Sequence, residues 1–190
     1  MELGHSPLLS YIALCAWQKM AVPQQSATIS IRRATSEDAP GILACLREAF
    51  EDYRRFYTPD AFLDTVLTPQ TIHERLAKMI VFVAVSPSRR IAGTIACNVV
   101  NRDEGHLRGM AVCPAWHGTS LASQLLSHAE SELRRRKCTG ITLDTTEPLK
   151  RAMRFYEKHG YRRSGKISDF FGMPLFEHYK QLVREDTPGS

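Results

Sequence analysis

Hydrophobic side chains recur along this chain with two different periods, and the period predicts whether a segment is a strand or a helix. Apolar and polar residues that alternate, or a short β-branched and aromatic run, are typical of strands. Segments with such patterns are residues 28–34, 79–85, 91–100, 105–113, 140–146, 161–167 and 173–182. The sequence therefore predicts a sheet of about six to seven strands.

A helical spacing of apolar residues follows the first predicted strand. Within residues 35–50, Ile42 and Phe50 belong to an apolar stripe with steps of three and four residues. Thr35 and Asp38 precede the stripe with the spacing of a capping box, which places acidic charge in the first turn. We predict a helix here.

Three further helical segments are predicted along the chain. One zone lies within residues 59–79 and should break near Pro69, because proline disrupts a helix interior. Residues 121–133 carry apolar side chains four positions apart, which indicates a long amphipathic helix. Residues 147–160 read as a helix with a proline in its first turn and Gly160 as its stop.

The order of these elements predicts the fold class. Strands come first as hairpins and later alternate with helices, which favours an α/β (α+β) fold with one mixed central sheet flanked by helices. At 190 residues the chain is long enough for one ordinary domain with a real core. We assign residues 26–186 to that domain, residues 1–25 to an N-terminal extension and residues 187–190 to a tail.

The N-terminal extension contains an apolar segment at residues 7–17. It has the length of a signal-peptide core, but no Lys or Arg precedes it and no small-residue cleavage site follows closely. We interpret residues 1–25 as a helical N-terminal extension; the alternative is that translation begins at Met20. The polar stretch 22–27 resembles a linker.

Composition narrows the class of protein further. Hydrophobic residues make up 43% and charged residues 24% of the chain, which is ordinary for a soluble globular protein. The formal charge of +5 is too small to indicate nucleic acid by itself, and no apolar run is long enough to span a membrane. The five cysteines are scattered without a CxxC pair, so we expect a cytoplasmic protein without disulfides or metal.

A cationic run at residues 134–137 ends the long predicted helix. Positive charge suits that end of a helix dipole, and no aromatic residues are interleaved as in a nucleic-acid site. We therefore expect no nucleic-acid partner.

A turn of small residues at positions 117–122 joins a predicted strand to the long helix. Backbone N–H groups at such a junction are unpaired, and the helix dipole favours negative charge. Small side chains such as those of Gly118 and Ala122 let a phosphate approach the backbone. The alternative is an ordinary helix cap, because Thr119 and Ser120 are good capping residues.

The wider pattern resembles the GNAT superfamily of N-acetyltransferases. That family has an acyl-CoA loop, Arg/Gln-x-x-Gly-x-Gly/Ala, a few residues after Val-x-Pro. Here Val112 and Pro114 match, and Ala122 fills the last small position. His117 stands where Arg or Gln is usual, and Ser120 replaces the first glycine.

A second motif of the family lies in the last predicted helix. Ala-x-x-x-Tyr-Glu-Lys-x-Gly-Phe/Tyr is matched by Ala152, Tyr156, Glu157, Lys158, Gly160 and Tyr161. An asparagine often found three residues before the alanine is Leu149 here, which removes one polar contact to CoA. The resemblance covers roughly residues 27–184.

The resemblance implies an acetyl-CoA-dependent N-acetyltransferase, with acetyl-CoA as cosubstrate and no metal. Residues 110–112 would hold the pantetheine arm along a strand that splays from its neighbour. The positions that the resemblance assigns to acetyl-CoA are Met110, Ala111, Val112, His117, Gly118, Thr119, Ser120, Leu121, Ala122, Leu149, Ala152 and Tyr156. Ordinary sheet pairing and core packing remain the alternative for residues 110–112.

Acyl transfer from a thioester to an amine needs an oxyanion donor, a base and an acid. The resemblance makes Tyr156 the acid that protonates the thiolate, because a phenol stays protonated at neutral pH. His106 is the candidate base, since histidine titrates near neutral pH. Glu104 and a chain of water molecules are the competitors.

The acceptor is the least determined part of the reaction. The family implies a primary amine on a small molecule or a peptide, bound by a monomer or homodimer. The aromatic residues Phe50, Tyr53, Phe56 and Tyr57 would line the amine pocket or pack in the core. A non-catalytic acyl-CoA-binding or regulatory module and a structural domain are the alternatives from other classes.

Overall fold

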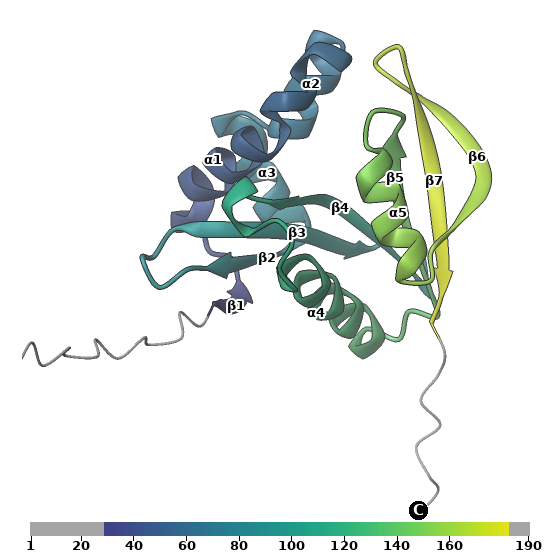
Figure 1. The fold of residues 1–190 in the computed structure, drawn as a ribbon. Helices are drawn as coiled ribbons and strands as arrows, with labels where there is room; N and C mark the ends of the chain where they lie inside the picture. The colour runs from purple at the N-terminus through teal and green to yellow at the C-terminus, as the bar shows by residue number, and fades with distance from the viewer. Residues whose placement is uncertain (1–28, 183–190) are drawn as a thin grey trace, which may run out of the picture.

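The computed structural model describes residues 29–182, which form one seven-stranded sheet with the order β1-β2-β3-β4-β5-β7-β6 (Figure 1). The strands are β1 (Ser30–Arg33), β2 (Ile80–Val85), β3 (Ile91–Val99), β4 (Glu104–Val112), β5 (Gly140–Thr146), β6 (Arg162–Phe170) and β7 (Met173–Gln181). Neighbouring strands are antiparallel except β4 and β5, which are parallel. The predicted mixed sheet is confirmed.

Five α-helices accompany the sheet in the described part of the chain. They are α1 (Ala39–Phe50), α2 (Pro59–Val66), α3 (Pro69–Lys78), α4 (Leu121–Arg135) and α5 (Lys150–Lys158). The predicted break near Pro69 is confirmed, because Thr68 caps α3 by accepting the backbone N–H of Thr71 and Pro69 occupies the first turn.

The start of α5 differs from the prediction of a helix from residue 147. Residues 147–148 form a turn, with the N–H of Leu149 donating to the carbonyl of Thr146 at 3.0 Å. The helix begins at Lys150, so Pro148 precedes the helix rather than lying in its first turn. The turn carries the chain from the end of β5 back toward the sheet.

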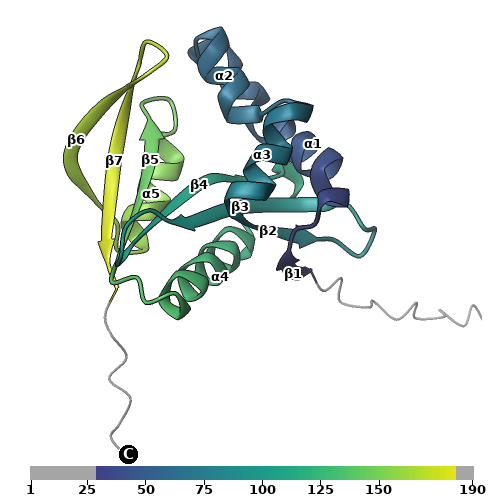
Figure 2. The same cartoon turned by 180° about the vertical axis from the view of Figure 1, so that it is seen from behind.

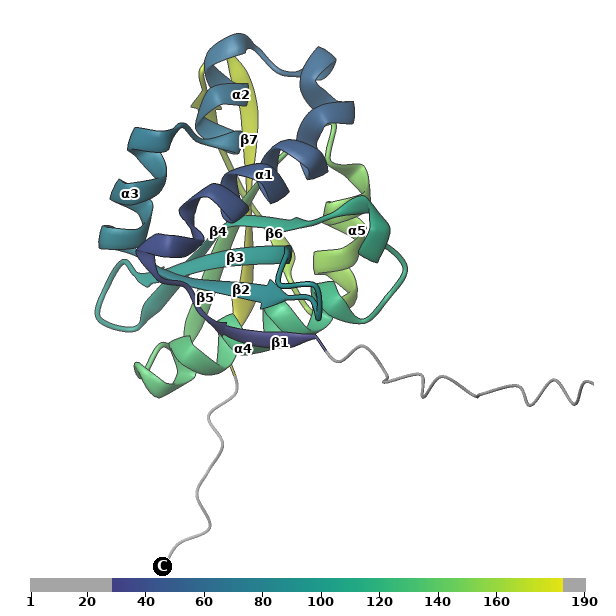
Figure 3. The same ribbon diagram turned by 90° about the vertical axis from the view of Figure 1, so that its left-hand side faces the viewer.

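Two hydrophobic clusters lie on the two faces of the sheet. One joins α4 and α5 to the strands through residues such as Leu125, Leu133 and Tyr161. The other joins α1, α2 and α3 to the opposite face through residues such as Ile42 and Ile72. Figure 3 shows α1 and α4 on opposite sides of β2–β4, and Figure 2 shows α1 and α3 from behind.

The two parallel strands at the centre of the sheet separate after a short pairing. Residues 104–107 of β4 pair with residues 140–143 of β5, and the pairing then stops. A bulge in β4 sets Gly109 and Met110 against the single residue Ile95, with Gly109 at φ +62°. Such a bulge bends the strand, and Figure 1 shows β4 and β5 diverging.

Some expectations concern residues outside the described range. The extension at residues 1–25 and the tail at residues 187–190 both lie beyond it, so the predicted domain limits remain predictions. Among residues 29–182, no helix has the length and apolarity needed to cross a membrane.

Candidate active site

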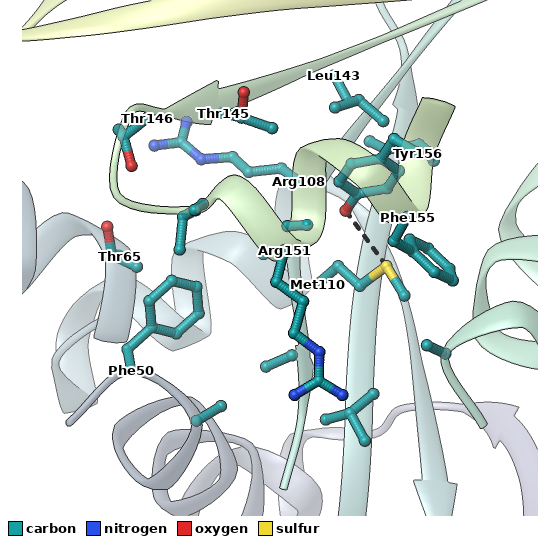
Figure 4. Close-up of a pocket in the computed structure, with 18 of the residues that line it drawn as sticks. Phe50, Thr65, Arg108, Met110, Leu143, Thr145, Thr146, Arg151, Phe155 and Tyr156 are labelled. Carbon is teal, nitrogen blue, oxygen red and sulfur yellow. Dashed lines mark hydrogen bonds between the residues drawn. The ribbon is translucent and has the colours of Figure 1, made fainter. Parts of the chain in front are cut away.

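A cavity of about 550 Å³ follows the line along which β4 and β5 separate. At one end it is lined by the loop before α4 and by α5, and at the other by residues of α1, α2 and α3. Figure 4 shows Tyr156 and Met110 on one side of it, with Phe50 and Thr65 opposite. The cavity therefore joins segments that are far apart in the sequence.

The loop before α4 presents unpaired backbone donors. Within the described residues, the N–H groups of Gly118, Thr119, Ser120, Ala122 and Ser123 have no hydrogen-bond acceptor. The N–H of Leu121 donates to the Thr119 hydroxyl at 3.3 Å, and the first helical N–H to reach a backbone carbonyl belongs to Gln124, which donates to Ser120 at 3.0 Å. Clustered free N–H groups at a helix start attract anions.

Side chains reinforce this loop as an anion site. Gly118 has φ +79°, and a Cβ there would meet no atom within 4 Å, so glycine is needed for its conformation rather than for space. Nε2 of His117 lies 2.9 Å from the carbonyl oxygen of Val112, to which it donates. Nη1 of Arg151 lies 3.4 Å from Nδ1 of His117, which adds a cation at the loop.

Several of the residues assigned to acetyl-CoA line the cavity and others do not. Met110, Ala111, Val112, His117, Gly118, Thr119, Ala122, Leu149, Ala152 and Tyr156 line it. Ser120 and Leu121 are not among the lining residues: the Ser120 hydroxyl accepts a hydrogen bond from Gln124 at 2.7 Å, and the Leu121 side chain is buried in the core. Arg151, which lines the cavity, is absent from the sequence-based assignment.

Tyr156 stands near the middle of the cavity wall. Its side chain is buried, and its hydroxyl donates to the sulfur of Met110 at 3.3 Å (Figure 4). Burial raises the pKa of Tyr156 above the ordinary value of 10.0. The phenol therefore keeps its proton at neutral pH.

His106 is held by a short chain of polar groups across β4 and β5. Its Nδ1 lies 3.0 Å from the Thr142 hydroxyl, which in turn donates toward a carboxylate oxygen of Glu104 at 3.4 Å. This chain favours the tautomer with the proton on Nδ1. Nε2 then carries the lone pair, 3.7 Å from a carboxylate oxygen of Asp144.

Burial shifts the pKa values of both partners in this pair. It lowers the pKa of His106, an effect that the Asp144 charge partly opposes. Burial also raises the pKa of Asp144, opposed in part by His106. His106 is therefore an unprotonated base at neutral pH. Asp144 lies beside it in the cavity.

The far end of the cavity is lined by aromatic and charged side chains. Phe50, Tyr53 and Tyr57 line it, whereas Phe56 is half exposed and lies outside it. The Tyr57 hydroxyl is 2.6 Å from that of Thr146, which links α1–α2 to the end of β5. These aromatic residues thus divide between the cavity wall and the surface.

Charged residues at this end were not identified from the sequence. Arg108 of β4 forms an ion pair with Asp64 of α2. Arg75 of α3 lies against Gly109, since a Cβ added to that glycine would collide with Nη1 of Arg75. A single charged residue on an amphipathic helix or an alternating strand usually faces solvent, so no local sequence signal marks Arg75 or Arg108.

Comparison with known proteins gives one family match. Residues 43–161 match the model of the acetyltransferase (GNAT) family. An aminoalkylphosphonate N-acetyltransferase of Salmonella typhimurium is 29% identical over 142 residues, which cover 70% of this chain and 85% of that protein.

Solved structures share the fold. The PaiA N-acetyltransferase of Thermoplasma acidophilum, in complex with coenzyme A, has a TM-score of 0.67 at 17% identity and covers 81% of this chain and 99% of its own. The ribosomal-protein-S18-alanine N-acetyltransferase of Escherichia coli also has a TM-score of 0.67 at 17% identity, and the match covers 86% of this chain and 99% of that protein.

Proposed function

The chain belongs to the GNAT family of acetyltransferases, and on that premise we propose that it transfers the acetyl group of acetyl-CoA to a primary amine of a small molecule. One observation carries the proposal: a single cavity connects the free N–H groups before α4, the Tyr156 hydroxyl and the His106–Asp144 pair. These are the anion site, acid and base that the reaction requires.

The α4 end of the cavity would hold the pyrophosphate of acetyl-CoA. Five free N–H groups, the helix dipole and the nearby Arg151 guanidinium support this placement. The unpaired edge of β4 from Arg108 to Val112 would accept the pantetheine arm, since its backbone groups have no β5 partner. A relative of the same fold was solved in complex with coenzyme A.

The proposed reaction is a direct attack on the thioester. The amine lone pair forms the C–N bond at the carbonyl carbon, and the C–S bond then breaks and leaves CoA as a thiolate. Nε2 of His106 takes the proton lost by the amine, and Asp144 stabilises the resulting imidazolium. The Tyr156 hydroxyl supplies the proton to the thiolate and is restored from solvent.

Glu104 is a weaker candidate for the base than His106. His106 lines the cavity, whereas Glu104 is not among the lining residues and contacts the Thr142 hydroxyl. We propose that Glu104 orients Thr142 and, through it, His106. A water relay from His106 to the amine fits the same arrangement.

The acceptor is proposed to be small and to enter between α1–α3 and β4. The aminoalkylphosphonate N-acetyltransferase of Salmonella acts, by its name, on a small amine, and it matches 70% of this chain. The cavity volume of about 550 Å³ has to hold the reacting end of acetyl-CoA as well, which supports a compact acceptor.

A panel of amines tests the proposal. The purified protein is incubated with acetyl-CoA and alkylamines, polyamines, amino acids, aminoalkyl acids or peptides, and CoA release is followed. Amine-dependent release with formation of the N-acetyl product is expected. Tight acetyl-CoA binding without turnover of any amine would identify a non-catalytic binding module, and no binding would contradict the proposal.

A further inference from the structure

Arg75 is a buried cation without a partner. Its side chain is only 9% exposed, and within residues 29–182 its guanidinium donates no hydrogen bond and forms no ion pair. Burial, assisted by the nearby Arg108, lowers its pKa to about 10, so it remains charged at neutral pH. The Arg75 nitrogens are not sealed from solvent, because among the described residues the fully buried, unpartnered side-chain polar atom is Nε2 of His178. A guanidinium that is largely buried, has no protein acceptor and still reaches the cavity is suited to bind an anion from the cavity.

The guanidinium faces the cavity at its acceptor end. Arg75 is one of the lining residues, and its Nη1 sits against Gly109, where β4 bulges. The neighbouring Arg108 charge is already balanced by Asp64. The Asp64 charge also acts on Arg75, so two guanidiniums share one carboxylate and this end keeps a net positive charge.

The opposite charge is that of Asp144 on the neighbouring strand β5, beside His106 of β4. His106 and Asp144 occupy the other side of the acceptor end, three strand positions before Gly109, or about 10 Å at 3.3 Å per residue. A basic nitrogen with a carboxylate suits an incoming ammonium, and a guanidinium suits an oxyanion. The cavity is thus polarised along the direction of the acceptor.

We propose that Arg75 binds a compact oxyanion, a carboxylate or phosphonate, at the end of the acceptor opposite its amine. The inference rests on the proposed function and narrows its acceptor to short aminoalkyl acids. The planar guanidinium matches both oxyanions in a two-point geometry. Arg75 is then a specificity residue that touches the acceptor and takes no part in proton transfer.

Three matched acceptors test the proposal by binding and by turnover. 2-Aminoethylphosphonate and 3-aminopropanoate carry the two oxyanions, and propylamine is an analogue of similar length that has the amine but no oxyanion. Binding is measured by calorimetric titration in the presence of CoA, and turnover by CoA release at saturating acetyl-CoA. Both readouts are taken for the parent and for Arg75→Met, Arg75→Lys and the exposed control Arg47→Met.

We expect Arg75→Met to weaken binding and lower kcat/KM for the two acids by about 10- to 100-fold, the value of a charged hydrogen bond. Binding and kcat/KM for propylamine should change by less than about 3-fold, and the KM for acetyl-CoA should not change. For Arg75→Lys we expect an intermediate loss in binding and in kcat/KM, because lysine keeps the positive charge but lacks the planar two-point geometry of the guanidinium. Arg47→Met should resemble the parent. The better of the two acids identifies the oxyanion.

Two results would overturn the inference while leaving the proposed function standing. One is a parent enzyme that uses propylamine as well as the acids. The other is an equal loss for all three acceptors in Arg75→Met, with a lower melting temperature, which would show a structural role at the Gly109 bulge. Conversely, Arg75-dependent binding of the acids without any turnover would support the inference and reject the proposed function.

Discussion

The two ends of the cavity hold charge by different means. At the α4 end the donors are backbone N–H groups of consecutive loop residues, which any small side chains would leave open. At the far end the charged groups are side chains of α2, α3, β4 and β5, which are brought together by the fold. The proposed nucleotide-type site is therefore local in sequence, whereas the proposed acceptor site is not.

The largest effect on the rate is expected at Tyr156, which lies between the two ends of the cavity. Tyr156→Phe keeps the ring packing and removes only the hydroxyl that we assign as the acid. We expect kcat to fall by about 10²- to 10⁴-fold, the usual contribution of such a group. Acetyl-CoA affinity should change little, as measured by calorimetry.

Tyr161→Phe is the matched control for this variant. The Tyr161 ring lies 5.7 Å from that of Tyr156, and its hydroxyl donates to Glu130 at 2.9 Å, away from the cavity lining. It should lose stability, by about 1–3 kcal/mol, without losing rate. Full activity of Tyr156→Phe would assign the tyrosine to packing and the proton to solvent.

A second test concerns the base at the acceptor end. His106 must be unprotonated to act, and burial lowers its pKa below the ordinary 6.5. The rate should therefore stay on its plateau as pH falls toward about 6.5 and decline only below it. In His106→Ala we expect a loss of about 10²-fold and the disappearance of this acidic limb or its shift to higher pH.

His128→Asn provides the control, because His128 lies on α4 outside the cavity lining and bonds to the carbonyl of Gln124. An unchanged acidic limb in His106→Ala would make Glu104→Gln the next variant to measure. If that profile were unchanged as well, water would remain as the proton acceptor, and His106 would only shape the cavity.

The α4 end is tested by adding a negative charge to it. Ala122→Glu places a carboxylate beside the free N–H groups, where it would repel a pyrophosphate. We expect acetyl-CoA to bind about 10- to 100-fold more weakly, because like charges near 4 Å cost roughly 1–4 kcal/mol at a partly exposed site. Ala122→Gln, of equal size, separates charge from bulk. Unchanged affinity in the folded Glu variant would place the phosphates elsewhere.

The smallest effect is expected at Ser120. Its hydroxyl accepts a hydrogen bond from the Gln124 side chain, and Ser120 does not line the cavity. Ser120→Gly should therefore bind acetyl-CoA within about 3-fold of the parent, since glycine is nearly as good at a helix start. A large loss of acetyl-CoA affinity in both Ser120→Gly and Ser120→Ala would show that the hydroxyl itself contacts a phosphate.

Much of the fold followed from local pattern. The positions of the strands and the break at Pro69 matched the structure because alternation, apolar stripes and proline act within a few residues. The start of α5 was missed, since the turn at residues 147–148 depends on how β5 ends against its neighbours rather than on Pro148 itself. Element boundaries are decided by such contacts.

The sequence by itself determined the small-residue loop before α4 and the helix that carries Tyr156, because both are continuous segments whose backbone geometry depends on their own residues. Only the tertiary structure decided which charges meet at the acceptor end. His106 reaches Asp144 across 38 positions and Arg108 reaches Asp64 across 44. Each of these residues is ordinary in its own segment, and their chemistry arises when the splayed strands and α1–α3 bring them together around one partly buried cavity.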